Sequence, residues 1–189
     1  VSSGGSLNIG SDGSAMNDIY VGGSVNSNYG VEFYAQNSIS VNGTEGIYTS
    51  FSANIDGGAT VYVAGNVIND GGSVNMGYNS NMQEVTIDGS VEASENVSIK
   101  SSGNITAGSL NGQSSVNLYA EIGTAQVNGD MNSYGYVYSE VDNLYVSCSV
   151  RVGDHRDLHS FPTRRSSDLV SSGGSINIGS DGSAMNDIS

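Results

Sequence analysis

Short runs of alternating apolar and polar residues recur along this chain, and one template describes most of them. The template has an apolar residue at position i, another at i+2, a glycine at i+4 and a third apolar residue at i+6. A spacing of two is the period of a β-strand, because successive side chains of a strand point to opposite faces. The template therefore predicts a short strand followed by a corner.

Copies of the template follow one another at a nearly constant distance. Copies that fit begin at Ile19, Val61, Val85 and, with a smaller first residue, Ala125. Three copies deviate: Ile39 with Glu45 in the last slot, Leu144 with Cys148 in the glycine slot, and a degraded copy at Asn104, Thr106, Gly108 and Leu110. The period is about 21 residues, which lies in the range of stacked-repeat architectures.

A second alternating run precedes most copies. These runs are Val31/Phe33, Val74/Met76, Val97/Ile99, Val116/Leu118 and Tyr136/Tyr138. The residues at i+3 and i+4 are pairs such as Asn-Gly and Asp-Gly, which tolerate the positive φ of a sharp corner. We expect each period to hold at least two short strands, with no helix.

Two folds satisfy this pattern, a parallel β-solenoid with one coil per period and an antiparallel meander with hairpin turns. The repeated motif favours the solenoid, because like residues then stack into ladders, whereas a meander pairs each copy with a non-equivalent neighbour. We predict an all-β chain, a single-stranded parallel β-solenoid (β-helix) with about 21 residues per coil. One inward row should contain Val21, Val63, Ile87, Val127 and Val146.

Residues 153–169 interrupt the pattern. They contain both histidines, the only proline and three of the five basic residues. Residues 157–169 are similar to the in-frame translation of a common short-read sequencing adapter, and such segments are excluded from fold reasoning. Residues 170–188 then repeat residues 1–19, with Ile176 in place of Leu7. We therefore predict a β-solenoid repeat region, as a fragment, at 1–152, a foreign and irregular insert at 153–169, and a partial copy of the N-terminal repeat at 170–189.

The chain is strongly acidic, with 19 acidic and 5 basic residues and a net charge of −14. Such a surface repels the phosphates of nucleic acids and the headgroups of anionic membranes, so we expect no nucleic-acid partner. No apolar stretch is long enough to span a bilayer, so we expect no membrane span. A single cysteine permits no internal disulfide.

The opening residues resemble a known class of surface protein. Gly4-Gly5-Ser6, Leu7-Asn8-Ile9, Gly13-Ser14-Ala15 and Gly22-Gly23-Ser24-Val25 resemble the passenger repeats of AIDA-type autotransporter adhesins. Residues 85–110 are similar to the coils of filamentous-haemagglutinin-type surface proteins. Both families have parallel β-helical stalks on bacterial surfaces, so the resemblance implies a repetitive β-solenoid stalk that is exposed on a cell surface or secreted.

The residues most often used in catalysis or metal binding are scarce. His155 and His159, with Asp154 and Asp157, have a spacing that can bind a metal on a helix, but they lie in the foreign segment. Cys148 has no histidine base in the remaining chain, which a cysteine nucleophile requires. Since it occupies a glycine slot, we expect it to be a small corner residue.

Turn oxygens, tyrosines and carboxylates form three further groups of candidates. Residues 10–13 and 69–72 carry oxygens that can hold Ca²⁺, but neither matches a calcium loop, and Asp and Asn are ordinary in turns. A sugar-stacking surface could come from Tyr34, Tyr62, Tyr119, Tyr136, Tyr138 and Tyr145, although strand packing explains them more simply. A glycosidase pair could come from Glu92, Glu95, Glu121 and Glu140, but no spacing selects any two. We assign no catalytic, cofactor-binding or metal-binding residue and expect no cofactor.

The favoured hypothesis is a non-enzymatic structural or adhesive stalk of a bacterial cell-surface or secreted protein, acting in adhesion or self-association. Glycans or other surface stalks are the expected partners. One alternative is a bactofilin-like, polymer-forming cytoskeletal solenoid, which a signal peptide on the full-length gene would exclude. Another is a surface polysaccharide-degrading β-helix, which clustered acids and a base on loop insertions would support.

Overall fold

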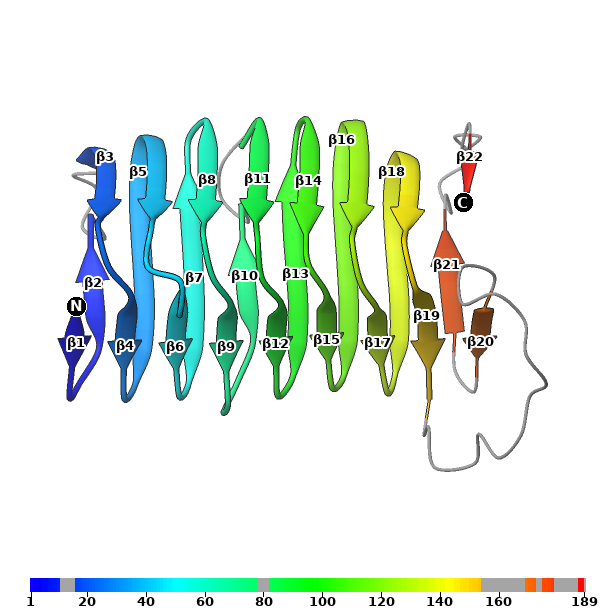
Figure 1. Ribbon diagram of the computed structural model, residues 1–189, viewed down its shortest axis with the longest axis horizontal. Coiled ribbons are helices and arrows are strands. Elements are labelled where there is room, and N and C mark those ends of the chain that lie inside the picture. Colours follow the sequence, from blue (N-terminus) through cyan, green and yellow to red (C-terminus); the bar gives the residue numbers. More distant parts are fainter. Residues whose placement is uncertain (11–15, 78–81, 154–168, 173–174, 179–186, 189) are drawn as a thin grey trace.

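The computed structural model describes residues 1–10, 16–77, 82–153, 169–172, 175–178 and 187–188. Every element in these residues is a β-strand, and the strands form parallel sheets. Coils about 21 residues apart stack into a β-solenoid of about 7 turns, which Figure 1 shows from the side. The predicted fold is confirmed, and the antiparallel meander is excluded.

Each coil contributes strands to three rows that run along the stack. Row A is a nine-stranded sheet of β1 (Ser2–Ser3), β4 (Val25–Ser27), β6 (Ile47–Thr49), β9 (Val67–Asn69), β12 (Val91–Ala93), β15 (Leu110–Gly112), β17 (Met131–Ser133), β19 (Ser149–Val152) and β20 (Leu169–Ser172). Rows B and C are the two halves of a thirteen-stranded sheet. They are joined where a long strand passes through both halves, in β5 (Gly30–Val41), β16 (Ser115–Val127) and β18 (Tyr136–Val146).

The remaining strands belong to one row each. Row B also contains β2 (Leu7–Ile9), β7 (Ser52–Gly57), β10 (Val74–Met76), β13 (Asn96–Ser101) and β21 (Ser175–Ile178). Row C also contains β3 (Met16–Val21), β8 (Thr60–Val63), β11 (Glu84–Ile87), β14 (Asn104–Ala107) and β22 (Asp187–Ile188). A coil therefore runs from row A through row B to row C and returns to row A.

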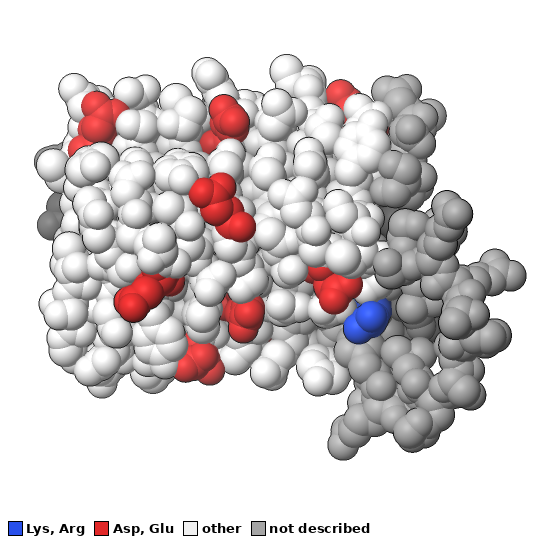
Figure 2. All heavy atoms as spheres, viewed as in Figure 1, with Lys and Arg blue, Asp and Glu red and all other residues white. Residues whose placement is uncertain are grey.

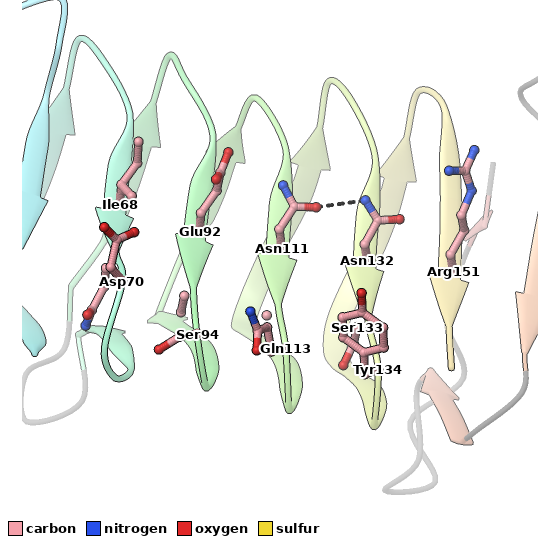
Figure 3. Close-up of a pocket in the computed structure, with 13 residues that line it drawn as sticks. Ile68, Asp70, Glu92, Ser94, Asn111, Gln113, Asn132, Ser133, Tyr134 and Arg151 are labelled. Atoms are coloured by element: carbon pink, nitrogen blue, oxygen red, sulfur yellow. Dashed lines mark hydrogen bonds between the residues drawn. The ribbon is translucent and has the colours of Figure 1, made fainter. Parts of the chain in front are cut away.

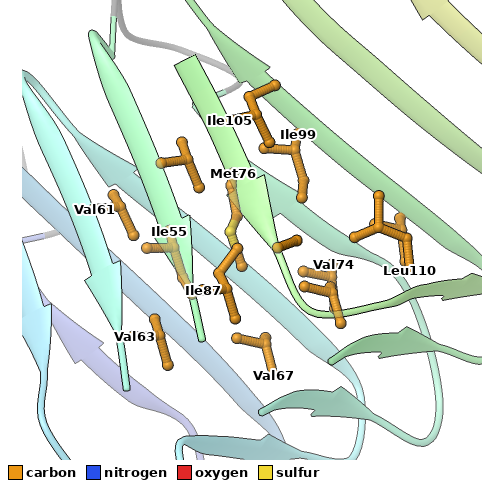
Figure 4. Close-up of a cluster of buried hydrophobic side chains, with 14 of the residues drawn as sticks. Ile55, Val61, Val63, Val67, Val74, Met76, Ile87, Ile99, Ile105 and Leu110 are labelled. Atoms are coloured by element: carbon orange, nitrogen blue, oxygen red, sulfur yellow. The ribbon is translucent and has the colours of Figure 1, made fainter. Parts of the chain in front are cut away.

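The core is a set of apolar ladders along the inside of the stack (Figure 4). In row C the inward partners in successive coils are Val21, Val41, Val63, Ile87, Ala107, Val127 and Val146. All are buried except Val146, which is partly buried against the core. The predicted inward row is therefore confirmed, with Val41 and Ala107 as additional members. Burial of each Val or Ile side chain stabilises the fold by about 1.5–3 kcal/mol.

The glycine slot of the template has a different physical cause from the one expected. Positive φ occurs among the described glycines at Gly10, Gly46, Gly77 and Gly153. Gly65 and Gly89 fill the template slot without it, but a Cβ on Gly65 would lie 2.4 Å from the carbonyl oxygen of Thr44. A Cβ on Gly89 would lie 2.2 Å from Oδ1 of Asn66. At these two positions glycine is needed because the preceding coil approaches too closely for a side chain, whereas Cys148 occupies the equivalent slot in the last copy.

A buried polar side chain closes the corner between rows A and B in several coils. The third residue of the row A strand is Ser27, Thr49, Asn69 or Ser133 in these coils. Thr49 Oγ1 donates to the carbonyl oxygen of Tyr29 in the preceding coil at 2.7 Å. Asn69 Nδ2 donates likewise to the carbonyl oxygen of Phe51 at 3.1 Å. These hydrogen bonds satisfy buried polar groups and tie each corner to the coil before it.

The structure shifts the degraded copy by one residue from Asn104 and Thr106. Its inward residues are Ile105 and Ala107, which pair with the inward residues of β11 and are fully buried. The corner that follows has two residues between β14 and β15, against three between β8 and β9. The fixed spacing of the template hid this deletion.

The alternating run of Tyr136 and Tyr138 lies on the outer side of its strand. Val137 and Ser139 are the buried residues of this strand, and Val137 pairs with Val116. Alternation alone does not reveal this direction, because the inward Ser139 is more polar than the outward Tyr138 beside it. Glu45 likewise does not break the coil, since a longer corner brings Ile47 into the inward slot.

The strand ladder extends into the C-terminal part of the chain. Gly153 N donates to the carbonyl oxygen of Ser133 at 2.9 Å, and Leu169 begins β20 opposite Ser149. The prediction of an irregular insert concerns residues 154–168, which lie outside the described residues. The copy at 170–189 supplies most of β20 and all of β21 and β22, which continue rows A, B and C.

Truncation of an inward ladder residue should destabilise the whole stack. Ile87 is fully buried between Val63 and Ala107. We expect Ile87→Ala to lower the free energy of unfolding by about 2–5 kcal/mol, through lost burial and a cavity. Thr86→Val, on the outer side of the same strand, should change it by less than about 0.5 kcal/mol. Urea titration followed by circular dichroism measures both, and similar losses would contradict the assigned faces.

Two buried serines should respond to the same substitution with opposite signs. Ser139 Oγ has no hydrogen-bond partner, so Ser139→Ala should raise the free energy of unfolding by about 1 kcal/mol. Ser133 Oγ donates to the carbonyl oxygen of Ser114 and accepts from Gly135 N, each at 3.2 Å. Ser133→Ala should therefore lower it by about 1 kcal/mol. Changes of the same sign in thermal or urea unfolding would refute this difference.

Candidate functional site

The outer face of row A carries a groove with a volume of about 360 Å³. Most row A strands here are three residues long, and because strand side chains alternate, the middle residue points outward. Figure 3 shows these middle residues in one line across successive strands. They are Ile68, Glu92, Asn111, Asn132 and Arg151, which are register partners.

A second line of side chains borders the groove where the row A strands end. It consists of Asp70, Ser94, Gln113 and Tyr134. Tyr134 is 58% exposed, so much of its ring is open to solvent. The groove therefore combines amides, carboxylates, hydroxyls, a guanidinium and one aromatic ring, placed at the spacing of the coils.

Two atoms in the groove lack hydrogen-bond partners. Asn132 Nδ2 donates to Asn111 Oδ1 at 2.7 Å, which leaves Asn132 Oδ1 free. Asn132 Oδ1 and Arg151 Nε are both buried atoms without a partner, and they lie in adjacent coils. Buried polar atoms without partners are uncommon in folded proteins. A hydroxyl group can donate to the first atom and accept from the second.

Charge changes sign along the groove. Glu92 Oε1 accepts a hydrogen bond from Ser90 Oγ at 2.9 Å, and the carboxylate of Asp70 accepts one from Tyr48. Asn111 and Asn132, which are neutral amides, follow Glu92 in the line, and the positively charged Arg151 is its last residue. In Figure 2 the acidic side chains are spread singly over the face in view. This arrangement suits a neutral polyhydroxylated ligand better than a polyanion, because carboxylates repel anions.

The six tyrosines considered as a sugar-stacking surface do not form a single surface. Tyr119 and Tyr138 are neighbours on the outside of row B, with ring centroids 5.2 Å apart and planes inclined by 42°. Tyr34 and Tyr136 also belong to row B, whereas Tyr62 and Tyr145 belong to row C. Only one close pair of rings is therefore assembled from this set.

Two tyrosines connect neighbouring coils through carboxylates. Tyr62 OH donates to Asp88 Oδ2 at 2.7 Å, and Tyr48 OH donates to Asp70. These hydrogen bonds raise the pKa of both phenols, since ionisation would place a phenolate beside a carboxylate. Both pairs are exposed, and exposed polar pairs contribute little to stability.

The four glutamates considered for catalysis lie in different environments. Glu92 lines the groove, and Glu95 Oε2 accepts from Ser73 Oγ at 3.1 Å in the adjoining corner. Glu121 lies in the middle of β16, between its row B and row C halves, and Glu140 Oε2 accepts from Tyr138 OH at 2.8 Å in row B. The structure therefore gives each carboxylate its own surroundings.

The other candidates of the sequence are corner residues or lie outside the described part. Asn69 Oδ1 accepts from Gly71 N at 3.1 Å, so this oxygen closes a corner. Residues 11–13 of the other turn, His155 and His159 lie outside the described residues. Cys148 is partly exposed in the corner before β19, where a small residue was expected.

The groove and one aromatic stack were not recognised in the sequence. Tyr29 and Phe51 stack with ring centroids 5.3 Å apart and planes 9° apart, and both are more than half exposed. Each follows the third row A residue by two positions, a regularity that was available in the sequence. The groove residues are the outward positions between the inward residues of row A. The sequence pattern predicted two strands in each period and did not identify the row A strand as a third one, so these positions were not recognised.

No group of three or more His, Cys, Asp or Glu side chains within the described residues could hold a metal ion. Nor does this part of the chain contain a helix of the length and apolar character needed to cross a membrane. Comparison of the chain with protein-family models, curated proteins and solved structures found no match.

Proposed function

We propose that this chain is a non-enzymatic structural and adhesive stalk of a bacterial cell-surface or secreted protein. The observation that carries the proposal is the separation of roles between the two faces of every strand. Inward positions form continuous apolar ladders, whereas outward positions of the same strands are mostly polar. Such a scaffold extends by adding coils, because each coil needs only its neighbours for stability.

The groove on row A is the contact surface in this proposal, and glycans are its ligands. Sugar hydroxyls both donate and accept, which matches the mixed amide and carboxylate lining. Asn132 and Arg151 line this groove, and their buried Oδ1 and Nε atoms have no hydrogen-bond partner in the structure. Tyr134 adds an exposed ring at the border, where the apolar face of a sugar can pack.

The experiment that tests the proposal measures binding and turnover together. The chain is incubated with a panel of neutral and acidic polysaccharides, with binding followed by biolayer interferometry and cleavage by release of reducing ends. We expect binding of at least one neutral glycan without release of product. Cleavage that is abolished by Glu92→Gln would favour the polysaccharide-degrading alternative, and absence of binding to every glycan would contradict an adhesive role of the groove.

Two substitutions in the groove should weaken binding of whichever glycan the panel identifies. Asn132→Ala removes the free acceptor and Tyr134→Ala removes the exposed ring. Each should raise the Kd about three- to tenfold, because one such contact is worth about 0.5–1.5 kcal/mol. Tyr20→Ala is the matched control, since Tyr20 is 75% exposed but lies in row C. An equal effect of Tyr20→Ala would place the ligand outside the groove.

A further inference from the structure

The groove on row A runs along the stack and across its strands. Its middle residues come from five successive coils and are Ile68, Glu92, Asn111, Asn132 and Arg151. Register partners in adjacent strands lie about 4.8 Å apart. The groove therefore presents one outward side chain at each such step, and its long axis is parallel to the axis of the solenoid (Figure 3).

A second side chain from most of these coils borders the same path. Four coils add Asp70, Ser94, Gln113 and Tyr134, each two residues after the middle residue of its strand. Hydrogen-bonding groups thus lie along both sides of a straight path and recur with each coil. A ligand that uses them fully needs polar groups on both of its edges, repeated at the spacing of the coils.

The amide groups at the centre of the groove suit the hydroxyl groups of a sugar. An amide both donates and accepts hydrogen bonds, and Asn111, Gln113 and Asn132 place three of them in two adjacent coils. The hydrogen bond from Asn132 Nδ2 to Asn111 Oδ1, at 2.7 Å, orients two of these amides relative to each other. Asn132 Oδ1 is a buried atom without a partner, so a ligand hydroxyl would satisfy it.

The spacing of the coils selects among extended polymers. An extended peptide presents the same face every two residues, about 6.6 Å apart, and falls out of step with the coils. Pyranose residues joined by equatorial β-1,4-linkages form a straight ribbon with hydroxyl groups on both edges, and each residue lengthens it by a distance close to the spacing of the strands. The same sugars joined by α-1,4-linkages form a coiled chain, which departs from a straight groove after a few residues.

We propose that this groove binds a neutral polysaccharide of β-1,4-linked pyranoses with equatorial linkages, with its chain parallel to the solenoid axis and one sugar residue on each coil. The carboxylates of Asp70 and Glu92 in the lining disfavour a polyanionic chain. The inference rests on the glycan binding of the proposed function and adds the linkage, the direction and the length of the bound chain. Affinity should then increase with each residue until the ligand covers the five coils of the groove.

The experiment measures the Kd of the full chain for β-1,4-linked oligosaccharides of increasing length. Three series, of glucose, N-acetylglucosamine and mannose, run from two to eight residues, and α-1,4-linked glucose oligosaccharides of the same lengths are the matched control. In at least one β-1,4-linked series, the Kd should fall about three- to tenfold with each added residue up to five and then stay nearly constant, because each coil adds about one contact. The control should bind about tenfold more weakly or less at five residues.

The outcomes separate this inference from the proposed function. A Kd that does not depend on length, or equal values for the α- and β-linked chains, overturns the inference and leaves an adhesive groove in place. Binding that is confined to glycans outside the three series has the same meaning. Absence of binding to every glycan overturns both the inference and the adhesive role of the groove.

Removal of one coil should shorten the ligand that the groove can hold. Deletion of residues 91–109 joins Ser90 to Leu110, and the sequence Gly-Ser precedes both Val91 and Leu110. Val91 and Leu110 are register partners, so the two flanking coils retain equivalent partners, and each coil needs only its neighbours for stability. The Kd should then level off at four residues in place of five. A plateau that remains at five, in a variant with the circular dichroism spectrum of the parent, overturns the arrangement of one residue per coil.

A point substitution tests the same groove without altering the stack, and it applies equally where the deletion variant does not fold. Asn111→Ala should raise the Kd for the five-residue ligand about three- to tenfold. Asn54→Ala is the matched control, because Asn54 Oδ1 accepts a hydrogen bond from Asn75 Nδ2 at 3.1 Å in the same way, but in row B. Equal effects of the two substitutions would place the polysaccharide outside the groove and overturn the inference.

Discussion

Parallel pairing of each coil with the next, at the spacing of about 4.8 Å between neighbouring strands, is the constraint on which the other features of this molecule depend. It makes register partners of equivalent residues, so an apolar residue in one coil requires an apolar residue at the same position in the next. It also brings corner backbones so close that a side chain at Gly65 or Gly89 would collide with the preceding coil. The polar corner residues Thr49 and Asn69 satisfy carbonyl groups of the preceding coil at the same spacing.

The same constraint leaves the outer surface free to vary. Each strand has one face committed to the core and one face that only water or a partner contacts. The outward positions of row A can therefore change from Ile68 to Glu92 to Asn111 without disturbing the ladder behind them. The groove owes its regular geometry to the coils and its chemistry to the residues that happen to occupy these positions, which is how a repetitive scaffold can carry a specific contact surface.

The fold could be predicted from the sequence because the inward pattern repeats in every coil, and the row from Val21 to Val146 was confirmed residue by residue. The pattern misleads where the chain deviates locally, as at Ile105, which lies before a shortened corner, and in β18, where two outward tyrosines flank the inward Val137. The groove could not be predicted, because its residues come from five different coils and become neighbours only once the third row is known. The reason why glycine occupies the i+4 position of the template could not be predicted either. The sequence alone does not distinguish a glycine that adopts a positive φ from one that allows two backbones to approach closely.

The corners between rows C and A differ in length, from two residues after β14 to five after β5, and yet the strands on either side keep their partners. Equivalent residues of successive coils are therefore defined by their place in a row and not by a constant spacing in the sequence. Insertions and deletions at the corners cost little, because doubling the length of a flexible loop costs only about 0.6 kcal/mol. A gene for such a chain can gain or lose codons at every corner while its product keeps the same interior, so length variation becomes a route by which the surface diversifies without a new fold.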